Sequence, residues 1–146
     1  MEPVAQGRPK FSSAGGFVRA YDPKKSRDAK SYIRMQAAEA MGMDPLFTGP
    51  VAIEITAFRA TPKSTSGRKA REMIGGFIIP TTKPDMSNYL KLVEDALNGI
   101  IWRDDSQIVD SLVRKRYGLT PGYEIIVREY LPEVEKESGD AIWQKK

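Results

Sequence analysis

Apolar residues recur at helical spacing in one part of this chain and alternate with small or polar residues in the next. Segment 26–41 has an apolar residue every three or four positions, which predicts an amphipathic helix capped by Asp22 or Ser26 and ended by Gly42. In segment 51–57 the large apolar residues occupy every second position, which predicts a strand. The first half of the chain therefore predicts both a helix and a strand.

The second half repeats this change of spacing. Segment 87–98 is a predicted helix whose apolar stripe begins at Met86, with Gly99 just beyond its end. Segments 106–117 and 123–130 are predicted to be strands that pair with each other. Together these elements predict an α+β fold, in which a small mixed β-sheet packs with two principal α-helices.

The remaining segments are predicted to be less regular. Residues 61–76 are basic and contain Pro and Gly, which indicates a loop with one helical turn, and a short strand is predicted at 77–80. Residues 1–25 are punctuated by proline and glycine and are predicted to be loop-like. We expect one domain over residues 1–130 and a charged tail over 131–146, in which Ile142 and Trp143 are candidates for docking.

The chain has 146 residues and contains neither cysteine nor histidine. Disulfides, thiolate or histidine-ligated zinc sites and every nuclease mechanism that uses histidine are therefore excluded. No segment approaches the ~20 apolar residues needed to cross a bilayer, and we expect no secretion signal. If the protein is a hydrolase, carboxylates, lysines and a bound metal ion must carry the reaction.

The formal net charge is +4, and the charges are unevenly distributed. Residues 1–30 contain seven basic and three acidic residues, and residues 57–71 contain five basic residues and no acid. Residues 85–110 instead contain six acidic and two basic residues. Basic segments that flank an acidic cluster suit an enzyme acting on phosphodiesters, because lysine and arginine neutralise phosphates while carboxylates hold a cation.

The second predicted helix has a polar face on which Ser87, Lys91 and Asp95 follow one another at four-residue intervals. Asp85 precedes this helix, and the acidic pair 104–105 follows it at the entrance of the next strand. Carboxylates are the ligands that Mg²⁺ prefers, the ion lowers the pKa of an attacking water, and a lysine can stabilise charge on the phosphate. The grouping is what metal-dependent phosphodiester hydrolysis requires.

Each of these residues also has an ordinary structural explanation. Asp85 can be a turn or helix-capping residue, and Lys91 with Asp95 can be an exposed helix pair. The acidic pair 104–105 can be a solvated turn. Spacing alone does not show whether Asp105 reaches Asp85, so position leaves both explanations open.

Three ordered motifs make the chain similar to a known family. They are Lys83-Pro84-Asp85-Met86-Ser87-Asn88-Tyr89-Leu90-Lys91, Asp95-Ala96-Leu97-Asn98-Gly99 and Asp104-Asp105-Ser106-Gln107-Ile108. They resemble the KPDxDNxxK, DALNG and DDxQ motifs of the RusA-like crossover junction endodeoxyribonucleases, and Lys115 matches a lysine of that family's later strand. The segments 3–10 and 21–23 look like the family's basic N-terminal loop, so the resemblance covers residues 3–130.

The resemblance implies a homodimer that resolves four-way (Holliday) DNA junctions in recombination and repair by symmetric cuts that require Mg²⁺, with Mn²⁺ as a substitute. It implies catalytic roles for Asp85, Lys91 and Asp105, with both aspartates as metal ligands. It also implies a cytoplasmic protein of bacterial or phage (prophage) origin that binds branched DNA and no membrane.

One position departs from the family pattern. The second aspartate of the first motif is replaced by Ser87, which is a neutral and weaker ligand that can instead cap a helix beginning at Asn88. Asp95 or Asp104 is a candidate metal ligand that replaces the missing carboxylate, and the alternative is a site that binds metal weakly.

The candidate DNA-binding residues are basic side chains of the N-terminal segment, the basic loop and the later strand. They are Arg8, Lys10, Arg19, Lys24, Lys25, Lys63, Arg68, Lys69, Arg71 and Lys115. Two other functions stay open: a nuclease for other branched or flapped DNA, and a catalytically weak or inactive branched-DNA-binding accessory protein of replication or recombination, which the serine at position 87 suggests.

Overall fold

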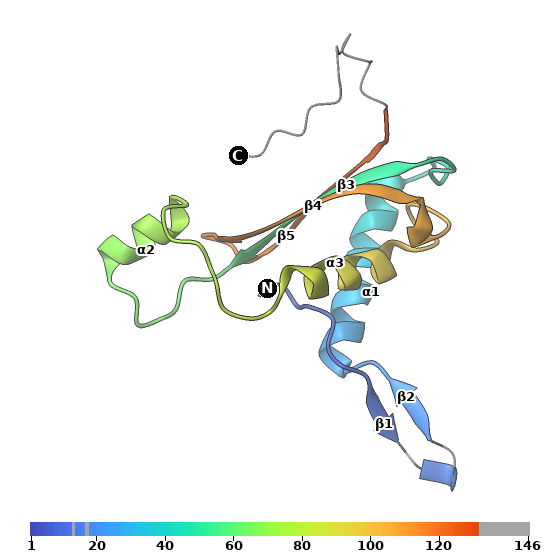
Figure 1. Cartoon of the computed structure of the whole chain (residues 1–146), viewed down its shortest axis with the longest axis horizontal. Coiled ribbons are helices and arrows are strands. Elements are labelled where there is room, and N and C mark those ends of the chain that lie inside the picture. Colours follow the sequence, from blue (N-terminus) through green and yellow to red (C-terminus); the bar gives the residue numbers. More distant parts are fainter. Residues whose placement is uncertain (13, 17, 132–146) are drawn as a thin grey trace, which may run out of the picture.

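The computed structural model describes residues 1–12, 14–16 and 18–131, so the predicted tail lies, from residue 132 onward, outside the described residues. Figure 1 shows a three-stranded sheet packed with two helices, from which a two-stranded ribbon and a further helix protrude in different directions. The predicted α+β class and mixed sheet are confirmed, and the described part contains a third, shorter α-helix besides the two predicted principal ones.

The sheet has the order β4-β3-β5. β3 (Val51–Arg59) is central, β4 (Ile108–Tyr117) runs parallel to it, and β5 (Gly122–Glu129) runs antiparallel to it. The prediction that the last two strands pair with each other is therefore wrong, because β3 lies between them. β3 is the most buried of the three strands, and because it is central, both of its edges are hydrogen-bonded to a neighbouring strand. β4 and β5 each contain several exposed residues.

The first principal helix, α1, spans Lys24–Met41 and ends before Gly42, as the spacing predicts. Its N-cap residue is Pro23, so neither Asp22 nor Ser26 caps the helix. The Ser26 side chain is buried, and its hydroxyl accepts a hydrogen bond from the N–H of residue 7 at 3.1 Å, which attaches the N-terminal segment to α1. No helix within the described ranges is long and apolar enough to cross a bilayer.

The second principal helix, α3, spans Met86–Leu97 and starts one residue earlier than predicted. Ser87 lies in its first turn and therefore does not cap it. Met86 is 49% exposed and does not belong to the apolar stripe, whereas Tyr89 and Leu92 are fully buried. The buried face of α3 is thus rotated from the predicted one toward these two residues.

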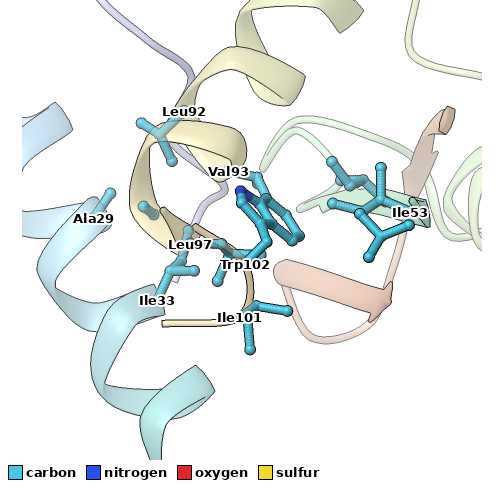
Figure 2. Packing of buried hydrophobic residues seen from close by; sticks show 11 residues of the cluster. Ala29, Ile33, Ile53, Leu92, Val93, Leu97, Ile101 and Trp102 are labelled. Atoms are coloured by element: carbon cyan, nitrogen blue, oxygen red, sulfur yellow. The ribbon is translucent and has the colours of Figure 1, made fainter. Parts of the chain in front are cut away.

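The core lies between β3 and the two principal helices, and Figure 2 shows Trp102 between Val93 and Leu97 of α3 and Ile53 of β3. The Trp102 side chain is fully buried, and its Nε1–H donates a hydrogen bond to Asn98 Oδ1 at 2.7 Å. The indole is therefore both packed and satisfied. It fixes α3 and the segment that follows it against the sheet, which sets the positions of the acidic residues at both ends of α3.

The basic loop predicted at 61–76 contains the third helix, α2 (Gly67–Ile74). Ser66 caps α2, because its side-chain oxygen accepts a hydrogen bond from the Lys69 N–H at 3.4 Å. Figure 1 shows that α2 protrudes from the body at the end of the sheet opposite to the turn beside α3. Because this segment contains glycine and proline, its sequence pattern indicates a loop and does not predict the helix.

No strand forms at 77–80, which corrects that prediction. The N–H groups of Phe77 and Ile78 both donate to the carbonyl of Glu72, at 2.9 and 3.2 Å. These residues therefore continue the C-terminal turn of the preceding helix, and Phe77 is 86% exposed. A short apolar run is ambiguous when no neighbouring strand edge is open to it.

The N-terminal segment crosses the body in extended form. Glu2 Oε1 accepts a hydrogen bond from the Ala60 N–H at 2.9 Å, the Tyr123 hydroxyl donates to the Val4 carbonyl, and the Gln6 N–H donates to the carbonyl of residue 88 at 2.9 Å. This segment thereby joins the end of β3, the start of β5 and the first turns of α3.

Beyond this segment, β1 (Lys10–Ser12) and β2 (Arg19–Tyr21) form an antiparallel ribbon in which Phe11 pairs with Ala20. The prediction of a loop-like N-terminus is thus incomplete. In Figure 1 the ribbon extends away from the body on the side of α1 and α3.

Candidate active site

Asp85 occupies the N-cap position of α3, with an extended backbone (φ −74°, ψ 152°). Its side chain makes no capping hydrogen bond, and among the residues that the structure describes the carboxylate has no other hydrogen bond or ion pair. The side chain is exposed. The geometry therefore does not support a capping role, and both carboxylate oxygens are accessible to a cation.

Two basic side chains of the sheet hold the loop that leads to Asp85. Lys115 of β4 donates from Nζ to the Thr82 carbonyl at 2.7 Å. Arg59, the last residue of β3, donates to Thr82 Oγ1 at 3.0 Å and to the Lys83 carbonyl at 3.1 Å. The sequence predicts DNA binding for Lys115 and assigns nothing to Arg59, but these contacts give both side chains a role in positioning the loop.

Lys91 lies on the exposed face of α3, and its Nζ is 3.1 Å from Asp95 Oδ1. The hydrogen bond to Asp95 raises the pKa of the Lys91 ammonium, and the negative charges of Asp105 and Glu94 act in the same direction. Lys91 therefore stays positively charged at neutral pH. Since 54% of its side chain is exposed, a bound phosphate can reach it.

Asp95 is held by two lysines at once. Besides Lys91, Lys30 of α1 approaches Asp95 Oδ2 at 3.2 Å, and the same Lys30 ammonium contacts Asp22 Oδ2 at 2.8 Å. The four side chains form an alternating chain of charges from Asp22 at the root of the ribbon to Lys91 on α3. Both oxygens of Asp95 are thus engaged by ammonium groups, and no local sequence signal reveals Lys30, because it lies 65 residues from Asp95.

The acidic turn after α3 gives its two aspartates different surroundings. Asp104 accepts a hydrogen bond at Oδ2 from the Ser106 N–H at 3.1 Å and, with Gln107, forms a capping box on the short 3₁₀ turn Asp105–Gln107. The bond from Ser106 lowers the pKa of Asp104. Asp105 is half-buried, and in the described part of the chain its carboxylate has no hydrogen bond or ion pair. Asp104 therefore shapes the turn and leaves Asp105 as its unpaired acid.

Glu94 belongs to this group, although sequence reasoning did not select it. Its side chain is half-buried, burial raises the pKa of its carboxyl group, and the negative charge of Asp105 raises it further. Glu94 lies seven residues after Ser87 and three after Lys91. The helical spacing that identified the polar face therefore places Glu94 on or beside the same face. The structure thus brings Asp105 near Lys91 and Glu94.

The structure does not gather Asp85, Asp95, Asp104 and Asp105 into one cage. Within the described ranges, no group of three or more Asp or Glu side chains is close enough to hold a metal ion. Mg²⁺ does not require such a cage, because it keeps several waters and often takes only one or two carboxylates together with substrate phosphate oxygens. Among the described residues the carboxylates of Asp85 and Asp105 are unpaired, so each can take part in that mode of binding, and the charge of Asp105 acts on Lys91.

Apart from Lys115, which is half-buried on β4, the predicted DNA-binding residues separate into two exposed groups. Arg8, Lys10 and Arg19 lie on or beside the ribbon, and Lys24 and Lys25 begin α1. Lys63 and the α2 residues Arg68, Lys69 and Arg71 form the second group. The groups lie on two protrusions that point in different directions (Figure 1). Within the described part of the chain, ion pairing in these groups is limited to exposed i,i+4 pairs, such as Lys24 with Asp28 at 2.9 Å.

Two comparisons with known proteins identify similar sequences. A model of the family described as Endodeoxyribonuclease RusA matches residues 1–128, which include the sheet except for the last residue of β5, together with the acidic residues described above. The chain is also 44% identical over 130 residues to a Bacillus subtilis (strain 168) protein described as the uncharacterized protein YqaN, with 88% of this chain and 91% of that protein covered.

Proposed function

This chain belongs to the RusA endodeoxyribonuclease family, and from that premise we propose that it is a divalent-cation-dependent endonuclease that resolves four-way DNA junctions by paired, symmetric cuts. The observation that carries the proposal is the placement of Asp105, which is half-buried and unpaired among the described residues, within the electrostatic reach of Lys91 and Glu94. An exposed acidic and basic surface of this kind can receive a phosphodiester backbone, whereas a closed pocket could not.

In this proposal Asp85 and Asp105 would hold the cation, and Mg²⁺ or Mn²⁺ bound there would supply polarisation of the scissile phosphate and a lowered pKa of an attacking water. Lys91 contributes a permanent positive charge toward the phosphate oxygens, because Asp95 keeps the lysine protonated and oriented. Asp95 is itself a positioning residue, since two ammonium groups engage its oxygens. Asp104 stabilises the turn that presents Asp105.

Substrate binding is assigned to the two basic protrusions, which contact the phosphates of the junction arms. Such contacts select shape and not base sequence. A homodimer with one site per chain would match the approximate twofold symmetry of a four-way junction. Light scattering coupled to size-exclusion chromatography should give the mass of two chains, and a monomer at all concentrations would contradict paired cutting by a preformed dimer.

The decisive test is cleavage of a mobile four-way junction, a flap and a linear duplex by the purified chain with Mg²⁺. We expect paired nicks on the junction, loss of cutting in Asp105→Asn with junction binding retained, and normal cutting in the matched surface variant Asp44→Asn. Loss of junction binding in Asp105→Asn would contradict its role as a metal ligand, and preference for the flap would reassign the substrate.

One observation favours a second candidate. Ser87 supplies no carboxylate, and no group of three acids able to hold a metal occurs in the described residues. A catalytically weak or inactive protein that binds branched DNA for replication or recombination would have these features. Tight junction binding with no nicking under Mg²⁺ or Mn²⁺ would establish that function in place of the first.

A further inference from the structure

The β1–β2 ribbon exposes an aromatic side chain that the body does not cover. Phe11 is 71% exposed at the middle of β1, and Val18 beside β2 is 73% exposed. A two-stranded ribbon is at best marginally stable by itself in water, and placing an apolar ring on its surface adds no burial to stabilise it. The position of Phe11 is therefore poorly explained by the folding of this chain alone.

The two faces of the ribbon differ in chemistry. Residues that pair across strands share a face, so Phe11 lies with Ala20, whereas Lys10 lies with Tyr21 on the other face. The first face thus carries an exposed ring beside a small residue, which leaves room for a flat group to approach it. The second face carries a lysine and an aromatic residue that is 42% exposed.

The charge of the ribbon identifies the kind of partner that suits it. Residues 8–21 contain Arg8, Lys10 and Arg19 and no acidic residue. All three basic side chains are exposed. Lys10 and Arg19 lie on the face opposite to Phe11, because they pair with Tyr21 and Ser12. A segment that carries exposed rings and basic side chains is one means by which proteins hold nucleic acid, since phosphates meet the charges and bases stack on the rings.

The root of the ribbon is fixed beside the candidate active site. Asp22 directly follows β2, accepts a hydrogen bond from Gln6 Nε2 at 3.1 Å and contacts Lys30 at 2.8 Å. Lys30 continues to Asp95 and, through it, to Lys91. The root of the ribbon is thus linked by consecutive ion pairs to α3, the helix that carries Lys91.

We propose that the ribbon enters the DNA at the branch point and that the Phe11 ring stacks on a base exposed there, while Lys10 and Arg19 hold the adjoining phosphates. This inference rests on the proposed function, whose substrate is branched DNA. A continuous duplex keeps its bases stacked, whereas a branch point offers base faces on which a ring can pack. The ring therefore discriminates between a junction and a linear duplex.

The test uses the full chain in EDTA, so that binding is measured without cutting, and a junction with 2-aminopurine at the branch point. Wild type should change the fluorescence of this base. Phe11→Ala should abolish the change and weaken junction binding by roughly 5- to 100-fold, the range given by loss of one stacked base, with little effect on linear duplex. Phe11→Trp should restore both.

Two controls separate stacking from other effects. Lys10→Gln should weaken binding to junction and duplex alike, and Leu119→Ala, which removes another exposed apolar side chain (85% exposed), should change neither. An unaltered fluorescence change and junction affinity in Phe11→Ala would overturn the proposal. A change in the oligomeric state of Phe11→Ala relative to wild type would also overturn it, because the ring would then be a contact between protein chains.

Failure of the Phe11 stacking proposal can be distinguished from failure of the proposed nuclease activity. Absence of cutting by wild type in Mg²⁺, with the Phe11-dependent fluorescence change intact in EDTA, would reject the nuclease and keep the stacking role. Normal cutting together with no dependence on Phe11 would reject the stacking role alone.

Discussion

Ser87 is the side chain at which one substitution should most alter the cation site. It is exposed in the first turn of α3, two residues after Asp85 and one turn before Lys91. An aspartate there would add a negative charge near Asp85 and would also be stabilised by the positive end of the helix dipole. We expect Ser87→Asp to lower the Mg²⁺ concentration for half-maximal cutting by roughly tenfold, which corresponds to about 1.4 kcal/mol of cation binding.

This requirement can be measured by titrating junction cleavage with Mg²⁺ and by calorimetry with Mn²⁺. Ser87→Asn is the matched control, because it adds the same shape without the charge and should leave the requirement unchanged. An unchanged requirement in Ser87→Asp would mean that another carboxylate already serves the site. Glu94→Gln would then raise the Mg²⁺ requirement, since the carboxyl group of Glu94 interacts electrostatically with Asp105.

Lys30 is the residue on which the chain of charges between the ribbon and α3 depends. Its side chain is only 16% exposed and contacts both Asp22 and Asp95. Lys30→Met leaves two carboxylates without that partner, so we expect the free energy of unfolding to fall by about 1–3 kcal/mol. Lys24→Met is the matched control, because the Lys24 pair with Asp28 is largely exposed and should contribute little.

The effect of Lys30→Met should depend on pH in a defined direction. The hydrogen bond from Lys30 lowers the pKa of Asp22 below its ordinary value of 3.8. A carboxyl group with a lowered folded-state pKa stabilises the protein above its unfolded pKa, and this stabilisation is lost as pH falls through the folded pKa. Urea unfolding should therefore show a difference between variant and wild type that narrows below pH 3.8; a constant difference down to pH 2 would contradict the assignment.

At the scale of elements, Gln107 joins the acidic turn to the segment that enters β3. Its Nε2 donates to the carbonyls of Phe47 and Gly49 at 2.9 and 3.0 Å, and its Oε1 accepts from the N–H groups of Arg103 and Asp104. We expect Gln107→Ala to lower the free energy of unfolding by about 2–4 kcal/mol, at about 1 kcal/mol per hydrogen bond.

Because the same bonds set the position of Asp105, Gln107→Ala should also slow junction cutting at temperatures where the variant is folded. Thermal denaturation followed by circular dichroism gives the first quantity, and cleavage rates give the second. Gln36→Ala, an exposed glutamine on α1, is the control and should match wild type in both. Equal stability of Gln107→Ala and wild type would show that water replaces these bonds without cost.

The elements also show which features a sequence can predict. α1, α3 and β3 could be predicted because their apolar spacing is local. The order of the strands could not, since it depends on competition for the central position among segments far apart in the chain. The same limit applies to the site: motifs identify Asp85 and Asp105, whereas the contact of Lys30 with Asp95 joins residues 65 positions apart.

At the scale of the whole molecule, the ribbon and α2 carry candidate DNA-binding residues on two protrusions that point in different directions (Figure 1). In the proposed function both protrusions contact phosphates of the junction arms. Neutralising α2 through Lys69→Gln with Arg71→Gln should therefore weaken binding to junctions of every sequence alike. The slope of log affinity against log salt concentration should fall in magnitude by about two, because two phosphate contacts are lost.

Fluorescence anisotropy at several salt concentrations measures this slope. Glu39→Gln, an exposed acidic residue of α1, is the control and should not weaken binding. A loss of affinity confined to one junction sequence would contradict a phosphate-contacting role for α2 and would indicate base recognition instead.

The central place of β3 also bears on how the chain matures during synthesis. Both ladder partners of β3 come from residues 108–129, so a nascent chain that has emerged only to its hundredth residue carries an apolar strand with two open edges. Folding of the sheet must wait until the last third of the chain leaves the ribosome. Truncation before residue 108 should therefore yield an aggregating fragment and not a smaller folded unit.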